Sequence, residues 1–248
     1  MSVGIIVPCE TAARRLPQGV MTPLAERPIV QHVVDRLRTG AALDLDLVVV
    51  ARSSPEDDDL VRWACEANVE VYRTPATDGL SPLLEVAWFY EMDVLVRVVG
   101  HSAFVHQPAV DPILDRLLSE GLDYVTTLGL PEGTSPEVIS RRALQDLARH
   151  LGEPSGGAPL VGPQLATCIT RAPERYRFAF ELAPPGLRRP EYCLTVEYED
   201  DLARARILCD RLNGNELPSL EEVIAILDRE PLLGAWSGQV AVLPPVPA

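Results

Sequence analysis

Short apolar runs alternate with stretches of helical periodicity along the first half of this chain. The apolar runs, which predict buried strands, occupy residues 3–7, 45–51, 69–73, 93–99 and 123–128. Helical periodicity begins at Ile29 and returns over residues 54–67, 81–90, 108–120 and 140–150. Strands that alternate with helices are typical of an α/β protein with a mostly parallel central sheet and helices on both faces.

The predicted sheet also indicates where a ligand would bind. In open α/β sheets, ligands lie in a crevice beyond the carboxyl ends of the strands. We therefore expect one site among the loops that follow Val7, Ala51, Arg73 and Val99.

Residues with strong helix-end preferences mark several boundaries. Ser54 and Pro55 are an N-cap residue and a proline suited to the first helical position. Gly121 can end the helix that precedes it by adopting a left-handed conformation. Ser219 with Glu222 forms a capping-box pattern, which predicts the start of a last helix.

The last third of the chain carries weaker signals. The pattern predicts a loop at 153–162, a strand at 192–196, and helices over 200–212 and 219–229. Because no internal repeat or linker interrupts the pattern, we expect a single domain over residues 1–236. The proline-rich residues 237–248 predict a loose tail.

Composition excludes several classes of protein. A formal charge of −14 argues against nucleic acid as a partner, because phosphate backbones need a basic surface. No apolar run approaches the roughly 18 residues of a membrane span, which predicts no membrane association. The chain begins without the basic and apolar regions of a signal peptide, so a cytoplasmic location is expected. Its five cysteines are scattered, which favours free thiols over a metal or disulfide framework.

The loop after the first strand carries the first candidate chemistry. Arg14 and Arg15 lie between the apolar run at 3–7 and the helix from Ile29, an arrangement that commonly holds the phosphates of a nucleotide. All 22 basic residues of the chain are arginine, so this loop has no lysine.

Several ordered segments then resemble the cytidylyltransferase family of SpsF-like proteins and CMP-sugar synthetases. The matching segments, in chain order, are Arg15-Leu16-Pro17, Pro23-Leu24, Ala51-Arg52-Ser53, Val96-Arg97-Val98-Val99-Gly100, Leu194-Thr195-Val196-Glu197 and Ser219-Leu220-Glu221-Glu222. The resemblance implies a Rossmann-like nucleotide-diphospho-sugar transferase fold. It also implies transfer of CMP from CTP to a sugar in surface polysaccharide biosynthesis, with a divalent metal such as Mg²⁺ and a possible homodimer.

This chain departs from the family pattern at residues that are expected to take part in phosphate binding and catalysis. Where the family continues Arg-Leu-Pro-Gly-Lys, this chain has Gln18 and Gly19, so the phosphate-binding lysine is absent. A second family lysine is replaced by Thr22, and the family's arginine at the strand exit is replaced in Pro8-Cys9. Arg14 is an additional cation that partly compensates in this interpretation.

The metal position of the family is also altered. The family's Gly-Asp-Cys-Pro reads Gly100-His101-Ser102-Ala103, and its late aspartate is Glu197. Mg²⁺ prefers oxygen ligands, whereas imidazole suits zinc, copper, iron or nickel. His101 is therefore a relic position without a metal, a ligand of another metal together with Glu197, or a catalytic base or substrate contact. Glu197 is a metal ligand or a solvated strand end.

The remaining binding residues follow from the resemblance. Arg15 is expected to contact a phosphate, the alternative being a structural salt bridge. Ala51, Arg52 and Ser53 lie where members of the family contact the base of the nucleotide. Asp78 lies where the family has an acidic residue near the ribose, or it simply forms a turn. Residues 156–169 contain no charged side chain, so no acceptor-sugar residue can be assigned there.

Three hypotheses remain from the sequence. The chain is an active cytidylyltransferase with Arg15 and His101 as catalytic residues. Alternatively, it is a catalytically impaired relative that binds a nucleotide or a protein, as the coordinated loss of lysine, arginine and aspartate suggests. A weaker third hypothesis gives His101 a new reaction in the old pocket.

Overall fold

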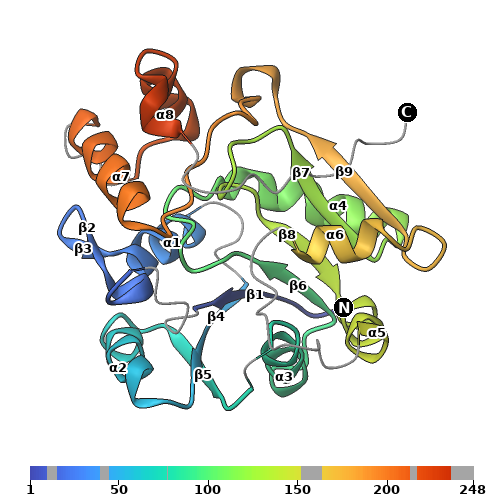
Figure 1. The fold of residues 1–248 in the computed structure, drawn as a ribbon. Coiled ribbons are helices and arrows are strands. Elements are labelled where there is room, and N and C mark those ends of the chain that lie inside the picture. The colour runs from blue at the N-terminus through green and yellow to red at the C-terminus, as the bar shows by residue number, and fades with distance from the viewer. Residues whose placement is uncertain (10–15, 40–44, 77, 152–163, 213–216, 236–248) are drawn as a thin grey trace.

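A seven-stranded sheet organises the computed structural model, which describes residues 1–9, 16–39, 45–76, 78–151, 164–212 and 217–235. The strand order is β5-β4-β1-β6-β8-β7-β9 (Figure 1). The strands are β1 (Val3–Pro8), β4 (Asp46–Arg52), β5 (Glu70–Thr74), β6 (Val94–Arg97), β7 (Tyr124–Leu128), β8 (Glu137–Ser140) and β9 (Phe178–Leu182). A separate small pair is formed by β2 (Pro23–Leu24) and β3 (Arg27–Pro28).

The sheet is parallel except at one strand. β1 pairs in parallel with β4 and β6, and β7 pairs in parallel with β9. β8 runs antiparallel to both β6 and β7. The predicted mostly parallel α/β sheet is therefore confirmed, and the β7–β8 connection lies at the same sheet edge as the carboxyl end of β6, since Arg97 pairs with Glu137.

Helices cover both faces of the sheet, as predicted (Figure 1). The helices are α1 (Ile29–Leu37), α2 (Asp58–Glu66), α3 (Ser81–Phe89), α4 (Val110–Glu120), α5 (Arg141–Leu151), α6 (Gln164–Thr170), α7 (Glu199–Arg211) and α8 (Leu220–Leu227). One core cluster joins α1, α2 and α4 to alternate strand residues such as Ile5 and Val96. A second joins α3, α5 and α6 to the intervening residues such as Ile6 and Leu95. Successive side chains of a strand point to opposite faces of the sheet, so each buried strand contributes residues to both clusters.

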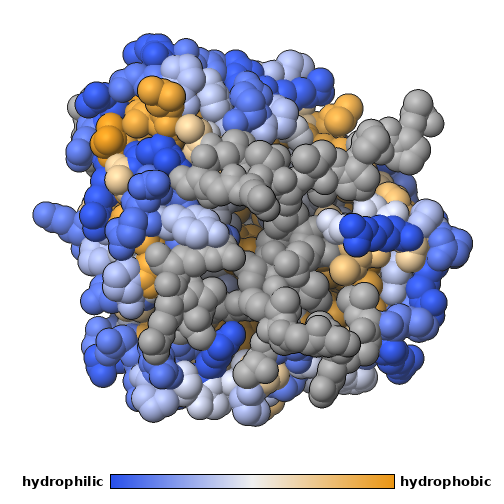
Figure 2. All heavy atoms as spheres, in the orientation of Figure 1, coloured by the Kyte–Doolittle hydropathy of each residue, from blue (hydrophilic) through white to orange (hydrophobic). Residues whose placement is uncertain are grey.

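A third apolar cluster lies beyond the carboxyl ends of the strands. It joins α7 and α8 to loop residues such as Phe104, Leu130 and Val196. The described surface in Figure 2 is mostly hydrophilic, and apolar side chains gather on it over α7 and α8. Among the described residues, no helix is long and apolar enough to cross a membrane.

Two predicted helix boundaries are confirmed, and a third differs. Gly121 ends α4 with φ +62°, and Ser219 with Glu222 forms the predicted capping box of α8. Ser54 makes no capping hydrogen bond, because a 3₁₀ turn over Pro55–Asp57 precedes α2.

The prediction of a strand at 192–196 was wrong. This segment makes one isolated bridge, between Glu132 and Cys193, and is otherwise irregular. The late strand is instead β9, whose period the sequence did not reveal because all five of its residues are only partly buried or exposed. The predicted loop at 153–162 and the predicted tail at 237–248 lie outside the described residues.

Candidate functional site

The carboxyl ends of β1, β4 and β6 meet in a closely packed arrangement. The backbone N–H of Cys9 donates to the carbonyl of Val50 at 3.0 Å, and that of Gly100 donates to the carbonyl of Pro8 at 3.0 Å. A Cβ on Gly100 would lie 2.5 Å from the Cys9 sulfur, so only glycine allows this approach. The chain is thus held where the loop with Arg14 and Arg15 departs; both arginines lie outside the described residues.

The exit of β4 is shaped by a buried carboxyl group. Ala51 is buried within the strand, Arg52 is half-buried and Ser53 is exposed. The backbone N–H of Arg52 donates to Oδ2 of Asp57 at 2.6 Å. Asp57 is 0% exposed, and its Oδ1 has no hydrogen-bond partner in the described part of the chain. Burial raises the pKa of Asp57 despite the bond from Arg52.

Asp57 therefore fixes the turn that presents Arg52 and Ser53, the residues predicted to meet the base. From the sequence, Asp57 shows only as an acidic residue shortly after Pro55. Its side chain instead bonds back to the strand, a contact five residues away that propensity alone does not reveal.

Asp78, predicted near a ribose, lies at the start of α3. Its Oδ1 accepts hydrogen bonds from the backbone N–H groups of Leu80 at 2.9 Å and Ser81 at 2.7 Å. Burial raises the pKa of Asp78, but the bonds from Ser81 and Leu80 lower it by more. One carboxylate oxygen is thus occupied by the helix start.

His101 and Glu197 lie in direct contact at the end of β6. Nε2 of His101 is 2.8 Å from Oε1 of Glu197, and the two side chains are 17% and 19% exposed. Both residues were predicted at the family's metal position, and the structure brings them together from distant segments of the chain. Carboxylate contact orients the imidazole ring, which leaves Nδ1 as the nitrogen not facing Glu197.

Backbone hydrogen bonds join three loops around this pair. The N–H of Val196 donates to the carbonyl of His101 at 3.2 Å, and the N–H of Leu194 donates to the carbonyl of Glu132 at 2.8 Å. Gly133 has φ +82°, and a Cβ there would lie 2.4 Å from Oγ1 of Thr195. The β7–β8 loop is therefore seated tightly against the segment that carries Glu197.

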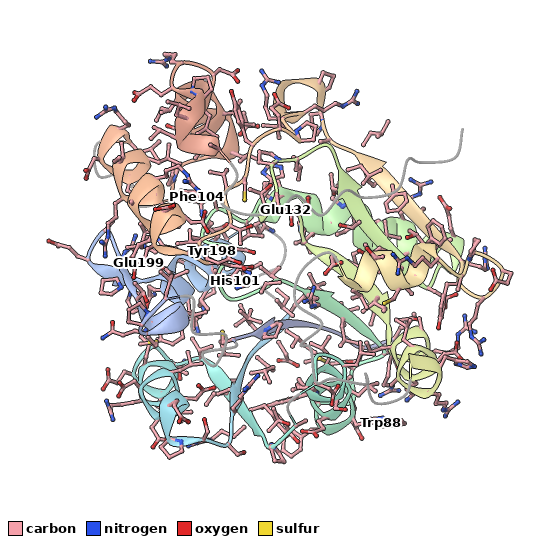
Figure 3. The ribbon with its side chains drawn as sticks, viewed as in Figure 1. Trp88, His101, Phe104, Glu132, Tyr198 and Glu199 are labelled. Carbon is pink, nitrogen blue, oxygen red and sulfur yellow. The ribbon has the colours of Figure 1, made fainter. Side chains whose placement is uncertain are left out.

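Glu132 is the residue that this arrangement adds to the site. Figure 3 shows Glu132, His101 and Tyr198 in the same central region, whereas Trp88 lies far away on α3. Burial, followed by the carboxylates of Glu137 and Glu197, raises the pKa of Glu132, and His101 lowers it by less. In the sequence, Glu132 is only an acid between a proline and a glycine, because its surroundings come from distant loops.

A buried polar network supports the floor of this region. Glu137 on β8 accepts hydrogen bonds from the Arg97 guanidinium and, at 2.5 Å, from the Tyr124 hydroxyl. Arg97 is 4% exposed and Tyr124 is fully buried. Burial and the neighbouring Glu137 raise the pKa of Tyr124, so its hydroxyl remains a donor. Because these partners satisfy one another, charged groups can lie beneath the crevice.

The loop after His101 is held from the opposite side by α1. Arg36 donates to the carbonyls of Ala103 at 2.9 Å and Pro218 at 2.8 Å, and its guanidinium lies 5.8 Å from the centre of the Phe104 ring. Burial lowers the pKa of Arg36 to about 10, at which the side chain stays charged near neutrality. Arg36 therefore links the His101 loop to α1 and to the start of α8.

The magnesium ion expected from the resemblance does not fit this donor set. Mg²⁺ requires near-octahedral oxygen coordination. The position of the family's aspartate is instead occupied by the imidazole of His101, which contacts the Glu197 carboxylate. No group of three or more His, Cys, Asp or Glu side chains arranged to hold a metal occurs among the described residues. Thr22, at the position of a family lysine, is 6% exposed and supplies no cation.

The fold matches the folds of solved structures. A cytidylyltransferase structure from Leptospira borgpetersenii aligns with a TM-score of 0.81 over 97% of this chain and 99% of that one, at 20% identity. The structure of CMP:2-keto-3-deoxy-manno-octonic acid synthetase complexed with CTP aligns with a TM-score of 0.61 over 86% and 100% of the two chains, at 15% identity. The fold is therefore the Rossmann-like fold of nucleotidyltransferases.

Sequence similarity identifies the family. Residues 4–153 match the family described as Cytidylyltransferase. The spore coat polysaccharide biosynthesis protein SpsF of Bacillus subtilis is 27% identical over 229 residues, which is 91% of this chain and 94% of that protein. A 3-deoxy-manno-octulosonate cytidylyltransferase of Yersinia pseudotuberculosis is 30% identical over 154 residues, 58% of this chain and 57% of that protein. This chain belongs to the cytidylyltransferase family, which confirms the predicted resemblance.

Proposed function

We propose that this protein binds CTP and transfers CMP to a sugar that is used in a surface polysaccharide. Family membership over residues 4–153 carries the proposal. The CMP:2-keto-3-deoxy-manno-octonic acid synthetase of similar fold was solved with CTP, and SpsF is a polysaccharide biosynthesis protein. A cytoplasmic location and a homodimer remain part of this proposal.

In the proposed reaction, a sugar oxygen attacks the α-phosphorus of CTP. The bond from that phosphorus to the bridging oxygen breaks, pyrophosphate leaves, and the proton of the attacking hydroxyl passes to solvent. Phosphoryl-type transfer depends mainly on positioning and on stabilising charge that spreads over the phosphate oxygens. Arg14 and Arg15 are the cations that we assign to this task.

Other residues of the crevice have assigned tasks as well. The turn at Ala51, Arg52 and Ser53, shaped by Asp57, is proposed to receive the cytosine, and Asp78 to lie near the ribose. His101, oriented by Glu197 at 2.8 Å, is proposed to face the reacting phosphate and to carry positive charge when its imidazole is protonated.

Pyrophosphate release from CTP tests the proposal. Wild-type protein is assayed with a panel of sugars in Mg²⁺, Mn²⁺ and Zn²⁺. Arg15→Ala is expected to lower turnover by about 10²–10³. Arg62→Ala is the matched control, since Arg62 pairs with Asp59 on the exposed face of α2. Absence of turnover under every condition would contradict transferase activity.

A second function is favoured by the contact between His101 and Glu197. A carboxylate that orients an imidazole no longer offers the oxygen pair expected of the family's metal site. A family member without efficient transfer would bind a nucleotide in a regulatory or structural role. Thermal shift with CTP, CDP and CMP distinguishes the two, because nucleotide stabilisation without turnover supports binding alone.

A further inference from the structure

The end of α3 carries exposed aromatic side chains, on a side of the molecule away from His101 and Glu132. Phe89 is 68% exposed and Trp88 is 58% exposed, which makes them the two most exposed aromatic residues in the described part of the chain. Figure 3 shows Trp88 at the periphery, far from the labelled residues around His101. Exposed aromatic side chains are enriched in protein interfaces, where they supply much of the binding energy. This end of α3 is therefore a candidate contact surface.

An edge strand of the sheet lies beside these rings. β5 ends the strand order and pairs with β4, so its other edge has no neighbouring strand among the described residues. The centroid of the Phe89 ring lies 5.5 Å from that of the Tyr72 ring on β5. An edge strand offers N–H and C=O groups to which a further strand can add. The exposed Phe89 thus lies where an added strand would contact it.

Two carboxylates accompany the aromatic rings on this face. Glu70 precedes Tyr72 by two residues on β5, so both side chains point to the α3 face of the sheet. Glu70 accepts a hydrogen bond from the Tyr90 hydroxyl at 3.4 Å. Glu85 lies one helical turn before Phe89, on the same side of α3. Its Oε2 is buried and has no hydrogen-bond partner among the described residues. Both carboxylates can therefore accept hydrogen bonds from an external donor.

The arginines near this surface are already paired with other carboxylates. Arg141 pairs with Asp93 at 2.8 Å, and its guanidinium lies over the Trp88 ring at 4.6 Å from the centroid. Arg73 on β5 points to the opposite face of the sheet and pairs with Asp58 at 2.9 Å. The contact of Arg141 with Trp88 and Asp93 is an example, within this chain, of a guanidinium bound by an aromatic ring and a carboxylate together.

We propose that the α3–β5 surface, formed by Glu70, Tyr72, Glu85 and Phe89, binds an extended, arginine-bearing segment of a partner protein that adds to the edge of β5. Successive side chains of such a segment alternate between the two faces of the sheet. Arginines on the α3 face pair with the carboxylates and stack on the rings. Apolar side chains on the other face lie beside the half-buried Val71. This inference does not depend on the transfer reaction.

Fluorescence anisotropy with labelled peptides tests the proposal. One probe peptide alternates arginine and valine, and a second has the same composition arranged in two blocks. The protein is expected to bind the alternating peptide about tenfold more tightly, because only that peptide presents all its arginines to one face. Glu85→Gln and Phe89→Ala should each weaken its binding about fivefold or more. Hydrogen exchange of the amides of residues 70–74 should slow when the alternating peptide binds.

Two variants elsewhere on the surface are the matched controls. Glu66→Gln on α2 removes the same charge as Glu85→Gln, and Leu232→Ala removes an apolar side chain that is 82% exposed. Both should bind the peptide as wild type does.

Equal weakening by Glu66→Gln and Glu85→Gln would show attraction to net charge alone and would overturn the proposal. Equal affinity for the two peptides, or unchanged exchange at residues 70–74, would overturn strand addition at β5. A dimer of wild type that dissociates in Phe89→Ala, measured by sedimentation, would overturn the partner segment and assign this surface to a second copy of the chain. None of these outcomes bears on CMP transfer.

Discussion

Nε2 of His101 lies 2.8 Å from Oε1 of Glu197 at the position where the family is expected to hold its metal. An imidazole thus replaces one of two carboxylates and turns toward the other. Two carboxylates repel each other and attract a divalent cation, whereas a carboxylate and an imidazole hydrogen-bond directly. This single replacement changes the chemistry that the end of β6 can support.

Restoring the carboxylate should restore a response to magnesium. With His101→Asp, two oxygen-donating side chains would face each other, as Mg²⁺ prefers. We expect Mg²⁺ to tighten CTP binding to this variant about tenfold, or about 1.4 kcal/mol, and to change wild-type binding far less. Calorimetric titration of CTP with and without Mg²⁺ measures the effect.

His101→Asn is the matched control for that experiment, because asparagine has the size of aspartate without its charge. Equal magnesium dependence in the Asn and Asp variants would show that the carboxylate is not the cause. An equally strong response in wild type would contradict the interpretation of His101 altogether.

Removing only one member of the Arg97–Glu137 ion pair should lower the free energy of unfolding strongly. Glu137→Leu leaves the 4% exposed Arg97 guanidinium and the buried Tyr124 hydroxyl without this partner. Removing one member of a buried ion pair typically lowers the free energy of unfolding by about 3–5 kcal/mol. Urea unfolding measures the loss, and Arg97→Met combined with Glu137→Leu should recover part of it. A double variant as unstable as the sum of both single variants would argue against coupling.

Gly133 should tolerate a side chain less well than Gly129. Both have positive φ, +82° and +90°, so alanine strains the backbone at either position by about 1–3 kcal/mol. Only at Gly133 would the new Cβ also meet Thr195, 2.4 Å from its hydroxyl and 2.7 Å from its backbone nitrogen. At Gly129 the nearest atom is 3.4 Å away.

Gly133→Ala should therefore lower the melting temperature more than Gly129→Ala does. It should also weaken catalysis or nucleotide binding, since it displaces Glu132 and the segment of Glu197. Equal effects of the two substitutions would mean that backbone strain alone matters and that the contact with Thr195 is dispensable.

Asp57 should make stability fall as pH rises. Burial raises the pKa of Asp57 in the folded state above the ordinary value of an aspartate, so the folded state retains the proton to a higher pH than the unfolded state does. Between those two pKa values the free energy of unfolding decreases with increasing pH. Asp57→Asn removes this contribution, so the stability of wild type relative to the variant should decline above about pH 4.

Urea unfolding from about pH 4 to about pH 8 measures that difference. Asp59→Asn on the exposed side of α2 is the control and should show no such trend. A constant difference for Asp57→Asn across the range would show that the Asp57 carboxyl titrates alike in both states.

The strands and helices of the first half followed from the sequence because their residues are buried in a regular period. β1, β4, β5, β6 and β7 lie within a residue or two of the predicted runs, since each run packs on both faces. β8 and β9 were missed: β8 is four residues long, and β9 lacks a buried residue. The segment at 192–196 looked like a strand because Leu194 and Val196 are buried, but they pack among loops.

Some residues of the candidate site could be predicted from the sequence, and others could not. Motifs identified His101, Glu197 and the turn at residues 51–53, and they indicated the altered metal position. No motif marked Asp57 or Glu132, because the first bonds back to Arg52 and the second is held by backbone bonds to Tyr192 and Leu194.

The sequence by itself determined the α/β alternation, the family and the loss of the arginine loop's lysine, because these depend on local pattern and residue identity. The tertiary structure decided that His101 contacts Glu197 and that the loop of Glu132 packs against the segment before Glu197. Those relationships join loops far apart in the chain, and they exist only where the strand order and backbone hydrogen bonds bring the loops together.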